Sequence, residues 1–176
     1  MIVEKLVVGF LKTNCYIVYS PDNRGCAVID PGGESRRICA DLEKRGLTPD
    51  VILLTHAHAD HVRGLWHLYE KTGACVYVHA GELDARINIG PFRFVPPPKT
   101  QYVCEGSTIC AGSLRFSVLE CPGHTPGSVV YRCEDTLFTG DTLLHMGSGR
   151  VDYPCSSRED MIASLTRLRD LSGDYH

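Results

Sequence analysis

The chain has 176 residues, of which 22% are charged, and its formal net charge is −3. This length suits one domain with a sizeable core, and the charge balance offers no basic surface for nucleic acid or an anionic membrane. Nine scattered cysteines without a C-x-x-C pair, and no evident secretory signal or membrane span, predict reduced thiols in a cytoplasmic protein.

The first half of the chain alternates apolar runs typical of strands with amphipathic segments typical of helices. Gly46 and Gly73 stand where two helices should end, and the turn at 20–25 predicts a hairpin. Alternation of this kind indicates an α/β architecture. The predicted strands cover residues 2–9, 14–20, 25–30, 51–55 and 75–79, and the predicted helices cover 34–45 and 61–72.

The second half begins with the least regular stretch, residues 87–103, whose glycine and prolines predict a surface excursion rather than a linker between domains. Apolar strands resume beyond it. A last helix is predicted over 157–171, with Ser156 and Glu159 spaced as a capping box and Gly173 as its stop. The predicted strands of this half cover 108–110, 114–120, 128–133 and 136–139.

A dense cluster of polar side chains follows the apolar strand that ends at residue 55. His56, His58, Asp60 and His61 place three imidazoles and a carboxylate within six residues. Alternate residues of an extended chain point the same way, so His56 and His58 can reach one point in space, while Asp60 and His61 face a second point beyond the turn. Neutral imidazole and carboxylate are ligands of zinc, and also of iron or manganese. The cluster therefore predicts a metal site.

Further candidates follow later strands. His124 sits in the tight loop Cys121-Pro122-Gly123-His124-Thr125-Pro126-Gly127, and Asp141 follows a strand and a glycine, where a carboxylate could bridge two cations. Asp30 also ends a strand and is either a turn former or an acceptor that orients a ligand histidine. His145 and Arg150 are weaker candidates for contacts with the substrate, and a structural salt bridge is an equal alternative for Arg150.

Taken together, the order and spacing of these residues resemble the metallo-β-lactamase superfamily over nearly the whole chain. Within it, the sequence is most similar to single-domain hydrolases of the glyoxalase II type. The motifs that carry the resemblance are His56-x-His58-x-Asp60-His61, Thr13-Asn14-Cys15-Tyr16-Ile17-Val18, Asp30-Pro31-Gly32-Gly33, the loop at His124, Gly140-Asp141-Thr142-Leu143 and Gly149-Arg150-Val151-Asp152.

The resemblance implies an αββα sandwich with a metal centre at one edge of its two sheets. It implies that His56, His58 and His124 bind one ion, that Asp60 and His61 bind a second, and that Asp141 bridges them. A β-lactamase of this superfamily commonly has cysteine where Asp141 stands. The family also has a last histidine in a Pro-Gly-His-Gly turn, which this sequence lacks, so we expect a single domain over 1–176 that is shortened at its C-terminus and lacks its last strand and turn.

The ligand pattern predicts a metal-dependent protein, and the resemblance implies a hydrolase of small acyl-thioesters with one or two zinc ions. A metal-bound hydroxide would attack the carbonyl, and Asp60 would orient that nucleophile. Two alternatives stay open: a mononuclear iron persulfide dioxygenase that uses His56, His124 and Asp141, and a metal-binding domain without catalysis. The expected partner is a small molecule, and neither the thiol carrier nor the oligomeric state follows from any motif.

Overall fold

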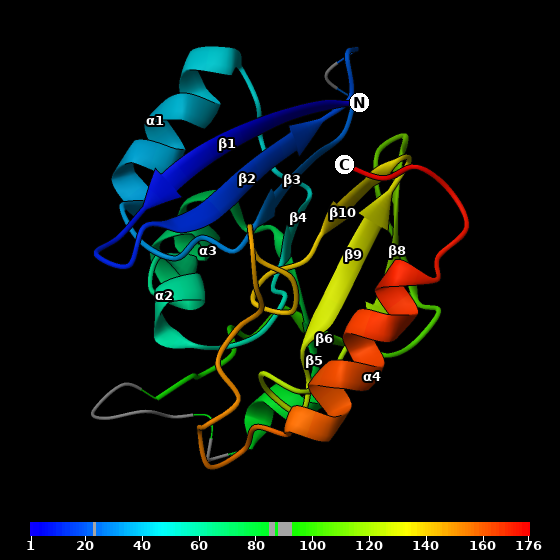
Figure 1. The fold of residues 1–176 in the computed structure, drawn as a ribbon. Coiled ribbons are helices and arrows are strands. Elements are labelled where there is room, and N and C mark those ends of the chain that lie inside the picture. The colour runs from blue at the N-terminus through cyan, green and yellow to red at the C-terminus, as the bar shows by residue number, and fades with distance from the viewer. Residues whose placement is uncertain (23, 85–86, 88–92) are drawn as a thin grey trace.

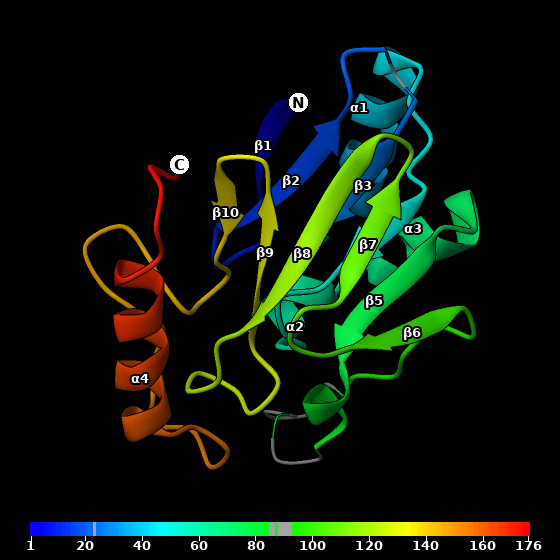
Figure 2. The same ribbon diagram turned by 90° about the vertical axis from the view of Figure 1, so that its right-hand side faces the viewer.

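A computed structural model gives the fold of residues 1–22, 24–84, 87 and 93–176, the part of the chain described below. Two β-sheets pack face to face, with helices on both outer sides (Figure 1). Figure 2, turned by a quarter, shows α4 alone on one side and α1 to α3 on the other. This arrangement is the predicted αββα sandwich.

The first sheet has the strand order β1-β2-β3-β4-β5-β6. β1 and β2 form an antiparallel pair, β3 is antiparallel to β2, and β3 to β6 run parallel to one another. The parallel strands therefore all end at the same edge of the sheet. The strands are β1 Ile2–Val8, β2 Thr13–Tyr19, β3 Cys26–Ile29, β4 Val51–Leu53, β5 Cys75–His79 and β6 Thr100–Val103.

The second sheet is antiparallel and has the order β10-β9-β8-β7. Its strands are β7 Thr108–Ala111, β8 Leu114–Glu120, β9 Val129–Cys133 and β10 Thr136–Phe138. At the chain end, the N–H of His176 donates to the Asp135 carbonyl, and the N–H of Leu137 donates to the His176 carbonyl. The last residue thus extends this sheet beyond β10.

The helices are α1 Ser35–Arg45, α2 Ala59–Val62, α3 Leu65–Thr72 and α4 Arg158–Arg169, with a 3₁₀ turn η1 at Ala80–Leu83. Within the described residues, no helix has the length and apolar character needed to cross a bilayer.

Three layers of buried side chains hold the sandwich together. The first lies between the first sheet and its helices and includes Ile17, Ile38 and Leu68. The second fills the space between the two sheets, where Phe116 and Tyr131 are fully buried. The third, smaller layer joins α4 to the second sheet through residues such as Leu168. Burial of these apolar surfaces is the main favourable term in folding.

Several predicted boundaries are confirmed. The hairpin between β2 and β3 is antiparallel, as the turn at 20–25 predicts. Gly46 and Gly73 end α1 and α3, each with a φ of 65°, a left-handed conformation that glycine adopts without steric cost. Apart from β6, the strands of both sheets lie within a few residues of the predicted ranges.

Other details of the prediction are wrong. The single helix predicted over 61–72 is two helices, since α2 ends at Val62 and α3 begins at Leu65. Between them, Gly64 donates its N–H to the Pro31 carbonyl, and a Cβ at Gly64 would lie 2.7 Å from that oxygen. The close approach of a distant loop therefore sets the break.

The prediction also missed β6, which lies inside the stretch 87–103 that we expected to be irregular; residues 88–92 of that stretch fall outside the described residues. The N-cap of α4 is Ser157, whose hydroxyl accepts from the N–H of Asp160, rather than Ser156. The same helix ends at Arg169 rather than at the predicted residue 171, and its C-terminal cap is Asp170.

Candidate metal centre

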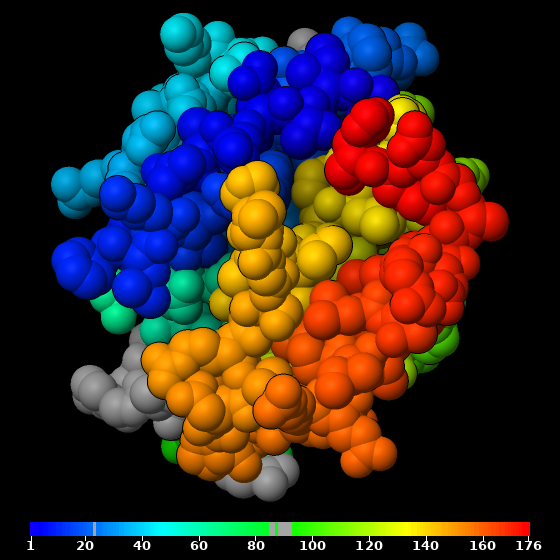
Figure 3. All heavy atoms as spheres, viewed as in Figure 1, coloured from blue at the N-terminus to red at the C-terminus, as the bar shows by residue number. Residues whose placement is uncertain are grey.

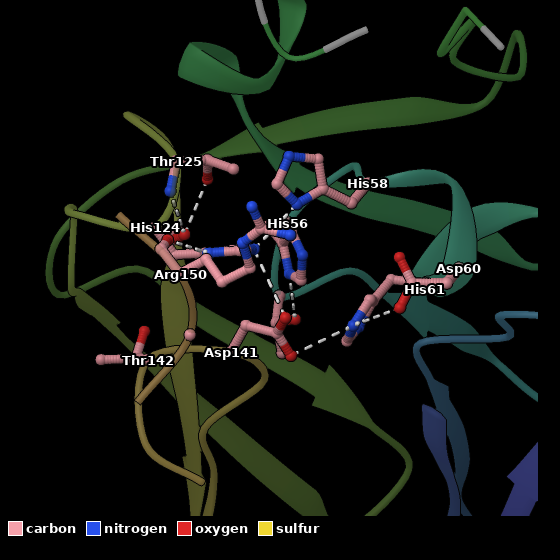
Figure 4. A network of polar contacts seen from close by, with 12 residues as sticks. His56, His58, Asp60, His61, His124, Thr125, Asp141, Thr142 and Arg150 are labelled. Carbon is pink, nitrogen blue, oxygen red and sulfur yellow. Dashed lines mark hydrogen bonds and ion pairs between the residues drawn. The ribbon is translucent and has the colours of Figure 1, made fainter. Parts of the chain in front are cut away.

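The chemically active side chains gather at one edge of the sandwich, at the carboxyl ends of strands from both sheets. The histidine loop follows β4, His124 lies between β8 and β9, and Asp141 follows β10. The N–H of Val129 donates to the Thr55 carbonyl at 2.9 Å, which joins the two sheets beside the site. Figure 4 shows the imidazoles and Asp141 converging on one another. The structure thus brings together residues up to 85 positions apart in the chain.

A first cluster consists of His56, His58 and His124, all buried. One ring nitrogen of each lies within 4.8 Å of the others, as three ligands of a single ion would. His58 Nδ1 is 2.8 Å from His124 Nε2. The rings of His56 and His124 meet edge to face with centroids 4.9 Å apart.

Hydrogen bonds to neighbouring groups fix which nitrogen each ring presents. His124 Nδ1 lies 2.8 Å from the Arg150 carbonyl, which can only accept, so Nδ1 carries the hydrogen, and Nε2, the nitrogen that faces His58 Nδ1, presents its lone pair. The Thr55 hydroxyl donates to Asp30 at 2.6 Å and therefore accepts from His56 Nδ1 at 3.1 Å. A ligand histidine in a metalloprotein commonly has its second nitrogen committed in this way.

The residues present fit a divalent ion. His56 Nε2 and His58 Nε2 are buried and have no hydrogen-bond partner among the described residues. Buried polar atoms are rarely left unpaired, because each costs about 1–3 kcal/mol. Burial lowers the pKa of His56 well below its usual range, and burial and the neighbouring His124 lower that of His58 to about 4. Both rings are therefore neutral at pH 7, the form that binds metal.

A second group lies beside the first. His61 Nε2 is 3.3 Å from Asp141 Oδ1 and 3.5 Å from Asp60 Oδ2, and the other oxygen of Asp141 is 3.4 Å from His124 Nε2. Asp141 therefore stands between the two clusters, where a bridging carboxylate would be placed. The preceding Gly140 has a φ of 49°, and a Cβ there would lie 2.3 Å from the Thr55 hydroxyl, so only glycine allows this approach.

Electrostatics distinguish His61 from the other histidines. Its burial lowers its pKa, but the negative charges of Asp30 and Asp141 outweigh this effect and raise it to about 10. The same contact with His61 lowers the pKa of Asp141 despite its desolvation. A proton and a divalent ion therefore compete for His61 Nε2.

Asp30 takes the orienting role that was one of its two predicted readings. Its carboxylate is buried and accepts from the Thr55 N–H at 2.8 Å, from the Thr55 hydroxyl and from His61 Nδ1 at 2.9 Å. Its backbone φ of 50° is unusual for a residue other than glycine, and such conformations concentrate at functional sites. Asp60 is held in turn by the Thr13 hydroxyl, which donates to its Oδ2 at 2.9 Å.

A cleft of about 840 Å³ opens over the two clusters. Its walls come from the β1–β2 turn, including Phe10 and Leu11, and from the segment after β10. Figure 3 shows that segment, in gold, on the surface between the blue N-terminal strands and the red end of the chain. The volume suits a small molecule.

The two weaker candidates occupy different places. Arg150 lines the cleft, but its guanidinium pairs with Asp152 at 2.7 Å and lies over the Tyr153 ring at 4.9 Å. His145 is exposed and lies at a separate, smaller hollow beside Tyr175, not among the residues that line the cleft.

Sequence reasoning missed supporting residues around both clusters: Thr13, Thr55, Glu82 and Thr125. Glu82 is only 1% exposed, although the short polar segment that carries it reads as surface. The one signal in the sequence was its position just after a strand, at the same edge as the histidine loop.

Comparison with known proteins agrees with this geometry. A family model described as the metallo-beta-lactamase superfamily matches residues 8–175. A probable metallo-hydrolase, YqgX, of Bacillus subtilis is 36% identical over 172 residues, which cover 92% of this chain and 81% of that protein. The hydroxyacylglutathione hydrolase GloC of Haemophilus influenzae is 31% identical, covering 99% of this chain and 87% of the relative.

Solved structures are similar as well. The BLEG-1 B3 metallo-beta-lactamase superposes with a TM-score of 0.83 at 31% identity, covering 94% of this chain and 84% of the other. A di-iron-bound form of TTHA1623 gives a TM-score of 0.82 at 32% identity, with 99% and 92% of the two chains covered. These similar proteins differ in named activity, and one of the structures is a di-iron-bound form.

Proposed function

The chain belongs to the metallo-beta-lactamase superfamily, and from that premise we propose that it is a metal-dependent hydrolase of small acyl-thioesters. The observation that carries the metal dependence is the cluster of buried imidazoles of His56, His58 and His124, with one ring nitrogen of each within 4.8 Å of the others. The similarity to GloC over nearly the whole of both chains supports the thioester as substrate class.

In this proposal His56, His58 and His124 hold one ion, Asp60 and His61 hold a second, and Asp141 lies between them. The close approach of ring nitrogens in the first cluster, and of carboxylate oxygens to His61 in the second, supports the assignment. Zinc suits this mixture of imidazole and carboxylate, and iron or manganese would also suit it. Such an ion would polarise a carbonyl and bring the pKa of a bound water to about 7.

The protein's own groups would do the rest of the work. Asp60 has its Oδ2 fixed by the Thr13 hydroxyl and faces the cleft, where it would orient an attacking water. Water would add to the thioester carbonyl, the carbon–sulfur bond would break, and the acid and the free thiol would leave. Arg150 pairs with Asp152 through Nε and Nη2, and at the cleft wall its Nη1 would attract a substrate carboxylate.

The apolar part of the cleft favours a substrate with an extended, partly apolar carrier. Phe10 is 97% exposed and Leu11 is 66% exposed, although both line the cleft, so they would gain burial from a bound ligand. Beside them Lys12 is exposed and would meet an anionic end of the thiol. A peptide-like thiol with carboxylates matches both features.

The test is the hydrolysis of a panel of thioesters, including a hydroxyacyl thioester of glutathione, by protein loaded with zinc or iron. Release of free thiol, measured with a thiol reagent, should require the metal and should vanish after chelation. A demetallated protein that hydrolyses the same thioesters at an unchanged rate would overturn the proposal.

One rival keeps a specific observation in its favour. The dioxygenase was predicted to use His56, His124 and Asp141. The structure places a different set of two histidines and a carboxylate, His56, His61 and Asp141, with ligand atoms within 4.8 Å of one another, and this is the type of ligand set that mononuclear iron(II) oxygenases use. A persulfide dioxygenase is also one of the alternatives that the sequence left open. Oxygen uptake by the iron-loaded protein with a persulfide substrate, without any thioester hydrolysis, would favour this rival.

A further inference from the structure

Glu82 is a buried carboxylate that lies outside the candidate ligand set. It belongs to η1, which directly follows β5, and only 1% of the residue is exposed. A glutamate is almost never buried to this extent unless other groups satisfy its oxygens. The identity of its partners therefore indicates what it does.

The carboxylate joins the two loops that carry the first cluster. One oxygen accepts from the N–H of Ala57, between His56 and His58, at 2.6 Å. The other accepts from the N–H of Gly127 at 3.0 Å and from the Thr125 hydroxyl at 2.5 Å, next to His124. The partners are 25 and 43 to 45 residues away in the chain, so these contacts join segments that are distant in sequence.

The contact is direct and leaves no room for a bridging water. A Cβ added to Gly127 would lie 2.7 Å from the nearer Glu82 oxygen and 2.8 Å from the Glu82 nitrogen. A second hydroxyl extends the network, since Ser128 Oγ lies 2.6 Å from Thr125 Oγ1. Because the Thr125 hydroxyl donates to Glu82, the Ser128 hydroxyl donates to Thr125.

The acceptor must be a carboxylate rather than an amide. Both loop N–H groups can only donate, and they face different oxygens of Glu82. An amide in the same position would turn its NH₂ towards one of them and leave that buried N–H unpaired. Burial raises the pKa of Glu82 to about 7 while the three donors oppose the shift, so the test is made at about pH 8, where the group is ionised.

We propose that Glu82 is a positioning residue of the first metal cluster: its carboxylate sets the spacing between the His56–His58 loop and the His124 loop. It touches neither ion nor substrate and acts through Ala57, Thr125 and Gly127. The inference rests on the metal centre of the proposed function, but not on the substrate class. Its consequence is specific to the first cluster, because Asp30, and not Glu82, holds His61.

The experiment compares Glu82→Gln with wild type by titration with cobalt(II) in competition with a chelator. Loss of a direct hydrogen-bond partner of a metal ligand commonly weakens metal affinity by about 10–100-fold. Glu82 acts one contact further out, through the loops that carry the ligands, so we expect the first cobalt ion to bind about tenfold more weakly. We also expect an altered visible spectrum of bound cobalt, which reports coordination geometry and which a merely structural residue would leave unchanged. Glu70→Gln, the same substitution at an exposed position of α3, should match wild type in both measurements.

A second variant covers the case in which Glu82→Gln does not fold. Thr125→Val removes one of the three donors and keeps the carboxylate, so it should weaken the first ion by a smaller factor, while Thr125→Ser should restore wild-type binding. Wild-type affinity and spectrum in Glu82→Gln, or in Thr125→Val if only that variant folds, would overturn the role of Glu82. A wild-type protein that binds no cobalt would instead overturn the metal centre itself.

Discussion

Replacement of Asp30 by asparagine tests whether a buried carboxylate holds the second metal-binding histidine in place. One oxygen of Asp30 accepts from the Thr55 N–H, and the other accepts from both the Thr55 hydroxyl and His61 Nδ1. Asparagine offers one acceptor and one NH₂ group in nearly the same shape. Whichever way the amide turns, at least one of these buried N–H donors loses its acceptor.

The magnitude follows from the contacts. A buried donor left without its acceptor costs about 1–3 kcal/mol, and loss of a hydrogen bond to a charged group costs about 1.5–3 kcal/mol. The free energy of unfolding of the metal-free protein should therefore fall by about 2–4 kcal/mol, since the two terms overlap at His61. Affinity for the ion at His61 should fall by about 10–100-fold, because the ring is no longer oriented.

The assay is a metal titration combined with urea unfolding of the metal-free protein. Asp41→Asn on α1, where the side chain is partly exposed, provides a matched control and should leave both quantities unchanged. Affinity for the first ion should fall less, because among its histidines His56 is linked to Asp30, and only indirectly, through the Thr55 hydroxyl. Two ions bound by Asp30→Asn as tightly as by wild type would refute the reasoning.

The remaining predictions concern ligands, protons and substrates. His58→Ala should lose the first ion, with affinity reduced by more than about 100-fold. The control His67→Ala on α3 should keep wild-type metal content. An unchanged metal content in His58→Ala would contradict the ligand assignment. The affinity for the ion at His61 should rise with pH by about tenfold per unit between about pH 6 and pH 8. The pKa of His61 is about 10, so the ring is protonated over this range and the ion must displace its proton, which is lost more easily as the pH rises. His56 and His58 have lowered pKa values and release none, so the first ion should show the smaller dependence, and equal slopes in a calorimetric titration would argue against this electrostatic picture. Thioesters should be hydrolysed faster than β-lactams, although the fold is shared with a B3 metallo-beta-lactamase, and a β-lactam with a kcat/KM above that of every thioester tested would show that the substrate class is wrong.

The architecture and the positions of the candidate ligands were accessible from the sequence because their signals are local. Apolar runs followed by His56, His58 and His61, or by Asp141, mark strand ends without knowledge of the fold. Glycines at 46 and 73 mark helix ends for an equally local reason, the left-handed backbone that the caps require. The alternation of these signals along the chain predicted an α/β architecture, and the resemblance to the metallo-β-lactamase superfamily implied the αββα sandwich.

What the sequence could not reveal depends on contacts between distant segments. The break before α3 follows from the approach of the Pro31 carbonyl to Gly64, and nothing near Gly64 predicts it. The support by Glu82 depends on three partners in two other loops. β6 was missed for a different reason, because the prolines at 96–98 outweighed the strand-forming residues that follow them.

The most direct test of the central claim is one measurement on three preparations: metal-loaded protein, the same protein after removal of metal, and metal-loaded His58→Ala. Each receives the hydroxyacyl thioester of glutathione and, in a separate run, a persulfide, and free thiol and dissolved oxygen are followed together. We predict rapid thiol release without oxygen uptake in the first preparation and little release in the other two. Equal thiol release in all three, or oxygen uptake with a persulfide and no thioester hydrolysis in the first, would contradict the account.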